Sequence, residues 1–203
     1  MSLQELSDSV NKLALQIQNL TARLDTALLA RDAPASAIAT PTKKPKRKCA
    51  PAAEGVIRVA STTKKSPYSK LSPLYKAEFT VDDKTYKTVE HYVQATKYES
   101  TKPELEAQLL QMDKAQLLRM TGSAKKYAEF VDPAYDICLA YCRGFVKQMR
   151  QNPDLRSLLE STGEAFIESE STDPMLGIGV DGAGENIIGN ALRATRWWLE
   201  THG

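Results

Sequence analysis

Residues 32–66 constrain this chain more than any other segment, because they carry no hydrophobic period and are rich in Ala, Pro, Thr, Ser and Lys. A segment of this composition buries too little apolar surface to offset the entropy lost when its backbone is ordered. We therefore expect a disordered linker at 32–66, a separate N-terminal segment at 1–31 and one folded domain at 67–203. A chain of 203 residues with 42% hydrophobic content is sufficient for one core plus extensions.

The linker is also basic. It has eight Lys and Arg residues against two acidic ones, whereas residues 67–203 have 16 basic and 20 acidic residues. Most of the linker's basic residues lie in the run at 43–48. This run predicts a nuclear-import signal or a contact with nucleic acid, and a linker that merely increases solubility is the alternative.

Residues 3–28 show a heptad pattern, with apolar side chains spaced alternately three and four residues apart. Ser2 and Glu5 form a capping box for a helix that begins almost at the N-terminus. The β-branched Val10 and Ile17 occupy one core position of the heptad and leucines the other, which favours a parallel two-stranded coiled coil and hence a homodimer. The alternative is an amphipathic helix that packs on the surface of its own domain.

The remaining domain is expected to be α+β and mostly helical. Residues 78–81 and 84–87 alternate around Asp82-Asp83 and predict a hairpin, followed by a helix over 88–99. Further helices should begin at Asp113, Asp132-Pro133 and Asn152-Pro153. We expect a short strand at 165–168, a glycine-rich loop at 177–184 and a last helix over 187–201.

Composition also narrows the class of protein. No apolar run approaches the roughly 18 residues of a membrane helix, and no signal-peptide pattern is present, so we expect a cytoplasmic protein, or a nuclear one if its source is a eukaryote or a virus of eukaryotes. Three cysteines without a C-x-x-C pair predict reduced thiols. His91 and His202 are the only histidines, so the usual zinc ligand sets cannot be assembled, and we expect neither a metal nor a cofactor.

Two groups of residues could carry chemistry. Glu90, Gln94 and Lys97 share one face of the helix predicted over 88–99, where a solvated helix face is the alternative. Glu168 lies on the predicted strand and Asp173 in the loop after it, where an outward-facing strand residue and a turn-forming Asp are the alternatives. Hydrolysis of a glycosidic bond uses one acid to protonate the leaving group and one carboxylate to activate water or stabilise the sugar cation.

The segment Gly177–Gly182 matches the G-x-G-x-x-G dinucleotide fingerprint. We reject a Rossmann interpretation, since too little chain follows for a βαβ unit, and Trp197 and Trp198 occupy the region where an acidic residue is needed.

Taken in order, these segments resemble the YbiA-like, or NADAR, family. The helix pattern S/T-x-E-H-x-x-Q-x-x-K of that family is matched by residues 88–97, and Ser72 lies in a looser match to its opening segment. A later signature of Thr-Gly, Glu, Asp, a Gly-x-Gly segment, Asn, Gly and Arg is similar to Thr162-Gly163, Glu168, Asp173, Gly177, Gly179, Asn186, Gly189 and Arg196. The resemblance covers about 130 residues.

The resemblance implies a compact YbiA-like (NADAR) domain preceded by the coiled-coil helix and the basic linker. It implies an N-glycosidase that acts on a ribosyl phosphate of riboflavin synthesis or on ADP-ribosylated guanine. By position, Glu90, Glu168, Asp173 and Lys97 become the catalytic candidates, with Lys97 either a phosphate contact or a nucleophile that forms a Schiff base. The candidates for substrate binding are Ser72, His91, Gln94, Gly177, Gly179, Asn186 and Arg196.

Two departures from the family pattern give a second hypothesis. Leu176 replaces the usual tryptophan and Lys70 the usual asparagine, and the loss of an aromatic plate from a cleft removes about 1 to 3 kcal/mol of base stacking. The alternative to an active enzyme is therefore an inactive adaptor that binds ADP-ribosyl groups and gains avidity from dimerisation through residues 3–28. A third, weaker hypothesis makes the domain a scaffold for a nucleic-acid-binding arm at 43–48.

Overall fold

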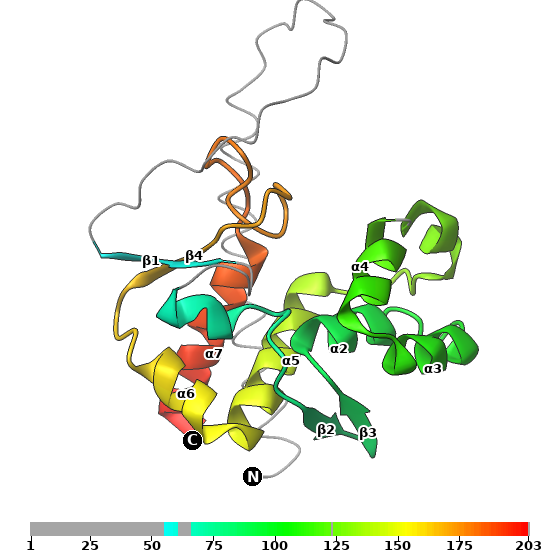
Figure 1. The fold of residues 1–203 in the computed structure, drawn as a ribbon, viewed down its shortest axis with the longest axis horizontal. Helices are drawn as coiled ribbons and strands as arrows, with labels where there is room; N and C mark the ends of the chain where they lie inside the picture. Colours follow the sequence, from blue (N-terminus) through cyan, green and yellow to red (C-terminus); the bar gives the residue numbers. More distant parts are fainter. Residues whose placement is uncertain (1–54, 61–65, 123, 203) are drawn as a thin grey trace, which may run out of the picture. The chain divides into compact units, whose positions relative to one another are not determined.

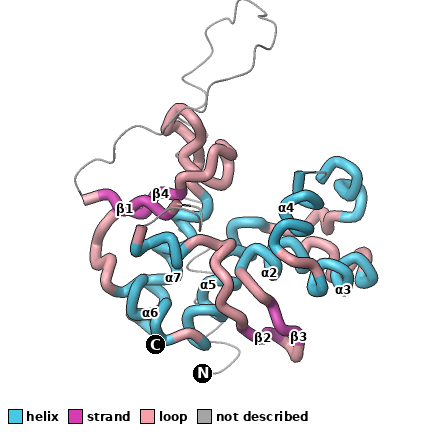
Figure 2. The backbone as a smooth tube through the Cα atoms, in the orientation of Figure 1, coloured by secondary structure: helices cyan, strands magenta, loops and turns pink. Residues whose placement is uncertain are grey.

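The structure, a computed structural model, describes residues 55–60, 66–122 and 124–202. The predicted coiled coil at 3–28 and the basic run at 43–48 lie outside these ranges. The described elements, in chain order, are β1 (Val56–Val59), η1 (Pro67–Leu71), β2 (Phe79–Val81), β3 (Lys84–Tyr86), α2 (Val89–Thr96), α3 (Pro103–Gln111), α4 (Lys114–Gly122), η2 (Ala124–Phe130), α5 (Ile137–Gln151), α6 (Pro153–Glu160), β4 (Phe166–Ser169) and α7 (Ile187–His202). Helices dominate, with two small two-stranded sheets (Figure 1, Figure 2), which confirms the predicted α+β, mostly helical domain.

The centre of the domain is α5, which packs against both α2 and α7. Asp136 caps α5 by accepting a hydrogen bond from the amide of Leu139. The large side chains Tyr141, Phe145 and Met149 recur every four residues along α5 and are fully buried. This spacing places them on one helix face, so α5 supplies a continuous apolar stripe for its neighbours.

Helix α2 is almost entirely enclosed, because every residue from Val89 to Ala95 is buried. The side chain of Thr88 caps it by accepting a hydrogen bond from the amide of His91, and the amide of Glu90 donates to the carbonyl of Pro73 at 2.9 Å. The second bond ties the segment after η1 to the first turn of α2. The polar residues of α2 are therefore held inside the fold, and the solvated-face alternative does not apply to them.

The predicted hairpin is confirmed. β2 and β3 pair in antiparallel register, with Phe79 opposite Tyr86, and the turn residues Asp82 and Asp83 have φ of 48° and 61°. Two consecutive positive φ values are what a tight two-residue hairpin requires. The ring of Tyr86 meets that of Tyr92 edge-on at 5.1 Å between centroids, which fastens the hairpin to α2.

The expected linker boundary at residue 66 is corrected by the second sheet. Residues 56–59 form β1, which pairs in parallel with β4, and Ile57 lies opposite Ile167. The four-residue run Val-Ile-Arg-Val is short, but β4 supplies the backbone hydrogen bonds that a lone strand lacks. The folded domain therefore begins before residue 67, and β1 belongs to it.

One predicted helix start is also corrected. Asp132-Pro133 forms a turn, in which Oδ1 of Asp132 accepts the amide of Ala134 at 2.8 Å, and α5 begins only at Ile137. The predicted start at Asn152-Pro153 is confirmed by α6, and that at Asp113 by α4. None of the helices in the described part of the chain combines the length and apolar character that a bilayer crossing needs.

Candidate active site

A cavity of about 560 Å³ lies where the ends of β1, η1 and β4 meet α2. Its lining brings together five of the residues predicted from sequence: Ser72, Glu90, Gln94, Lys97 and Asp173. The volume is within the range of small-molecule sites, about 300 to 1,000 Å³. Helices α4, α5 and α7 contribute apolar walls through Leu118, Ile137 and Ile188.

A chain of hydrogen bonds runs along the cavity face of α2. The hydroxyl of Tyr141 donates to Oε2 of Glu90 at 2.8 Å, and Nε2 of Gln94 donates to Oε1 of the same carboxylate at 2.7 Å. Nζ of Lys97 then donates to Oε1 of Gln94 at 2.9 Å. Each side chain in this chain is held by the next, so Glu90 and Lys97 are oriented before a ligand arrives.

The protonation of this chain is set mainly by burial. Burial lowers the pKa of Lys97, and the nearby charge of Glu90 opposes that shift only in part. More of the Lys97 amine is therefore neutral at a given pH than for a lysine in water. Burial also raises the pKa of Tyr141 well above its usual value, so its hydroxyl stays protonated and remains a donor to Glu90.

Asp173 lies at the exposed edge of the cavity. Its Oδ1 accepts hydrogen bonds from the amides of Met175 at 2.9 Å and Leu176 at 3.0 Å. The turn-forming role considered from sequence is therefore present, and Asp173 also lines the cavity. Leu176 lines the cavity as well, so the departure from the family tryptophan changes the wall of the site itself.

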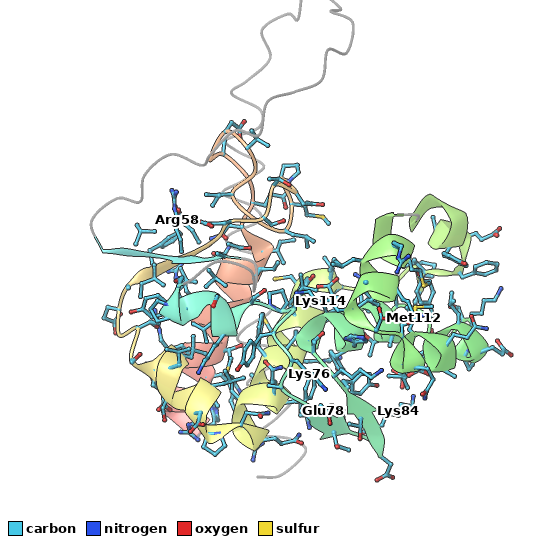
Figure 3. The ribbon with its side chains drawn as sticks, viewed as in Figure 1. Arg58, Lys76, Glu78, Lys84, Met112 and Lys114 are labelled. Atoms are coloured by element: carbon cyan, nitrogen blue, oxygen red, sulfur yellow. The ribbon has the colours of Figure 1, made fainter. Side chains whose placement is uncertain are left out.

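The structure does not bring Glu168 into this cavity. Its Oε2 accepts a hydrogen bond from Nε of Arg58 at 3.0 Å, in an ion pair that links β4 to β1. Figure 3 shows Arg58 on β1, well away from the hairpin residue Lys84. The cavity lining is made by its neighbours Ser169 and Glu170, so the catalytic role of Glu168 remains a prediction that its position does not support.

Three other predicted binding residues serve the scaffold. His91 is buried against Thr88 and the carbonyl of Met112, and burial lowers its pKa. Arg196 is buried and donates to the hydroxyl of Thr162 and the carbonyl of Ala165.

Asn186, at a φ of 56°, joins β4 to the loop before α7: its Nδ2 donates to the carbonyl of Ile167, and its Oδ1 accepts the amide of Ser169, both at 2.8 Å. All three residues are buried and bonded to backbone or scaffold side chains, so they stabilise the site without lining it.

The two predicted glycines shape the loop behind the cavity. A Cβ at Gly177 would lie 2.6 Å from Cβ of Ser171 and 2.7 Å from the carbonyl of Ser169, so only glycine permits this approach. Gly179 has a φ of 70°, and its amide donates to the carbonyl of Ser171 at 3.1 Å. The glycines thus hold the 169–171 segment in place and do not line the cavity.

Sequence reasoning missed several residues of the site. Tyr141 lies on the apolar stripe of α5, where nothing in the local pattern distinguishes it from a core tyrosine. Ser169, Glu170 and Ser171 line the cavity directly after β4. The position of polar residues at a strand end is the one signal that could have drawn attention to them.

In the part of the chain that the structure describes, acidic residues outnumber basic ones in the cavity lining. Among its lining residues are three carboxylates, on Glu90, Glu170 and Asp173, and one ammonium group, on Lys97. The described residues contain no cluster of three His, Cys, Asp or Glu side chains placed to hold a metal ion. Their polar groups can orient a sugar, exchange protons with it and offer an amine of lowered pKa.

These features define a class: a small, mostly helical α+β domain whose carboxylates and one lysine converge on a single ligand-sized cavity. The chain belongs to the NADAR domain family, whose model matches residues 61–200. The predicted family is confirmed.

Two similar proteins support this assignment. A riboflavin biosynthesis protein of Vibrio vulnificus is 30% identical over 134 residues, which are 65% of this chain and 36% of that protein. The chain thus spans about a third of the length of this curated relative. The NMR structure of Escherichia coli YbiA is similar in fold, with a TM-score of 0.58 and 22% identity, over 72% of this chain and 85% of YbiA.

Proposed function

We propose that this protein is an N-glycosidase that hydrolyses the bond between a ribosyl group and a nitrogen, in a ribosyl phosphate or an ADP-ribosyl compound. The observation that carries the proposal is the hydrogen-bonded chain Tyr141–Glu90–Gln94–Lys97 along one wall of a ligand-sized cavity. Membership of the NADAR family supports it. The name of the Vibrio vulnificus relative supports a riboflavin-pathway intermediate as one of the two substrate classes.

The reaction breaks the C1–N bond of the ribosyl group and leaves the bonding electrons on nitrogen. The departing nitrogen then needs a proton, and C1, which becomes positively charged, needs a nucleophile and a nearby negative charge. Glu90 and Asp173 are the two carboxylates that we assign to these roles, since both line the cavity and both match the family pattern, whereas Glu170 does not match it. Glu90 is fixed by two donors, whereas Asp173 lies at the exposed edge, where water enters.

Lys97 can supply the nucleophile that attacks C1. An amine attacks carbon only when it is neutral, and burial lowers the pKa of Lys97 in the direction that increases the neutral fraction. This property favours the nucleophile over the phosphate contact, for which a full positive charge is preferable. The attack would form a C–N bond to Lys97 as the bond to the leaving nitrogen breaks, and water would later release the sugar.

The decisive experiment measures release of free ADP-ribose from ADP-ribosylated guanosine, and of ribose 5-phosphate from pyrimidine ribosylamine phosphates. Wild type is compared with Glu90→Gln, Asp173→Asn and the matched control Glu168→Gln. General acid–base groups contribute about 100- to 10,000-fold, so Glu90→Gln should lose at least about 100-fold, and Glu168→Gln should retain activity. Asp173→Asn keeps an oxygen for the amides of Met175 and Leu176, so its loss of rate reports charge and not loop collapse.

If wild type turns over neither substrate but binds ADP-ribose, the N-glycosidase hypothesis is wrong and the protein is an adaptor that binds ADP-ribosyl groups. The position of Leu176 in the cavity wall is the observation that favours this second function. A leucine offers no aromatic face to a base, so an adaptor would retain the sugar contacts and lose base stacking.

The predictions about partners and location remain predictions. Homodimerisation through residues 3–28 is tested by the mass of the full chain and of a chain lacking those residues in solution. Nucleic-acid contact through 43–48 is tested by the salt dependence of binding, which should be steep with the run and shallow without it. Import into a nucleus is tested by fusing residues 43–48 to a fluorescent protein.

A further inference from the structure

The cavity contains two buried serines that the proposed chemistry does not use. Ser72 ends η1 and is 4% exposed, and Ser169 ends β4 and is 5% exposed; both line the cavity. Their hydroxyl oxygens accept amides two residues further on, from Leu74 at 3.3 Å and Ser171 at 3.4 Å. Within residues 55–60, 66–122 and 124–202, neither hydroxyl has an acceptor for its own proton.

A buried hydroxyl proton without an acceptor is unfavourable, and it is satisfied when a ligand supplies an oxygen. The two serines are held firmly enough to do this. The amide of Ser169 is bonded to Asn186, and the residue after Ser72, Pro73, accepts the amide of Glu90. Both hydroxyls therefore belong to backbone segments fixed by buried residues.

The charge of the cavity indicates what kind of ligand oxygen accepts these hydrogen bonds. Among the described lining residues, the carboxylates of Glu90 and Asp173 outnumber the ammonium group of Lys97, so a phosphate group inside would meet like charges. Sugar hydroxyls carry no charge, accept from serine and donate to carboxylates. Asp173 can accept a hydrogen bond from such a hydroxyl. Its Oδ1 already accepts the loop amides of Met175 and Leu176, and within the described residues no hydrogen bond to its Oδ2 is found.

We propose that Ser72 and Ser169 form a subsite that donates hydrogen bonds to the ring hydroxyls of the ribose, so that the enzyme selects ribosyl over deoxyribosyl substrates. This inference rests on the proposed function and specifies which part of the substrate the cavity binds. The phosphate lies outside the acidic part of the cavity. Selection comes from leaving a buried donor without its acceptor when the sugar hydroxyl is absent.

Binding of product-like sugars tests the subsite without requiring turnover. The probes are ribose 5-phosphate, 2-deoxyribose 5-phosphate, 3-deoxyribose 5-phosphate and inorganic phosphate, titrated by NMR into the full chain. The proteins are wild type, Ser169→Ala, Ser72→Ala and the control Ser161→Ala, whose exposed hydroxyl donates to the carbonyl of Leu158 in α6. Thermal unfolding of each variant establishes that it is folded, and if one serine variant unfolds the other carries the test.

We expect wild type to bind ribose 5-phosphate about three- to tenfold more tightly than at least one deoxy sugar, the range of one net hydrogen bond. Ser169→Ala or Ser72→Ala should lose that factor for ribose 5-phosphate and nothing for the deoxy sugar that already lacks the contact. Ser161→Ala should match wild type.

Equal losses for all three sugars and for inorganic phosphate would make this a phosphate subsite and overturn the inference. Unchanged affinities in both serine variants would overturn it as well. The experiment distinguishes failure of the subsite from failure of the proposed function. If wild type cleaves no N-glycoside but still discriminates between the sugars, the proposed function is wrong and the subsite remains. Turnover without discrimination between ribosyl and deoxyribosyl groups would instead remove the subsite and leave the glycosidase intact.

Discussion

Replacing Asn186 tests whether this residue is scaffold, as the structure indicates, or a substrate contact, as its place in the family pattern suggested. The change Asn186→Ala removes two hydrogen bonds of 2.8 Å, to the carbonyl of Ile167 and from the amide of Ser169, at a side chain that is 6% exposed. Each buried backbone group that loses its partner costs about 1 to 3 kcal/mol. The φ of 56° adds about 1 to 2 kcal/mol for alanine.

We therefore expect Asn186→Ala to lower the free energy of unfolding by about 3 to 8 kcal/mol. Asn186→Gly loses the same two hydrogen bonds but tolerates the positive φ, so its loss should be smaller by about 1 kcal/mol. The matched control is Asn190→Ala, on α7 one turn after Asn186, whose side chain donates an exposed hydrogen bond to the carbonyl of Glu185; it should lose about 1 kcal/mol or less.

Urea denaturation followed by circular dichroism measures all four proteins, with equal m-values as the check that only stability has changed. An Asn186→Ala protein as stable as wild type would refute the reasoning. If that stable protein also failed to bind ribose 5-phosphate, Asn186 would be a binding residue after all.

Three further predictions follow from the same geometry. Tyr141→Phe removes a donor to Glu90, so kcat should fall about tenfold; an unchanged kcat would exclude a positioning role for Tyr141. Burial lowers the pKa of Lys97, so its neutral fraction should appear at lower pH than that of a lysine in a short peptide. Reductive methylation followed by peptide mass spectrometry should give a lower midpoint for Lys97 than for the peptide; equal midpoints would contradict this prediction. Glu168→Gln breaks the ion pair with Arg58 and should lower the free energy of unfolding by about 1 kcal/mol or less, as measured by thermal unfolding. A larger loss would contradict the weak contribution expected of a partly exposed ion pair.

Local patterns were sufficient for the elements that local physics determines. The start of a helix at residue 88 and the tight turn at Asp82-Asp83 could be predicted because a few neighbouring residues fix these conformations. The shared direction of Glu90, Gln94 and Lys97 follows from helix spacing alone, and the structure brings all three to one cavity.

Contacts between distant segments could not be obtained in this way. Arg58 and Glu168 are 110 positions apart, and neither residue type nor alternation along a strand identifies such a partner. The same limit explains why Tyr141 was missed, because its hydroxyl reaches Glu90 only when α5 packs against α2. The family pattern includes Asn186, but a pattern does not distinguish a residue that contacts the ligand from one that holds the wall behind it.

Strand β1 has a practical consequence for the choice of recombinant fragments. The family match begins at residue 61, and the sequence pattern suggested a domain start at 67, so both boundaries would remove β1. A fragment cut at either place would lose Val59 and Ala60 from the cavity wall, and with them the hydrogen bond from the amide of Glu170 to the carbonyl of Val59. Such a fragment would lack one part of the cavity wall, whereas a fragment that begins upstream of Gly55 keeps Val59 and Ala60 in place.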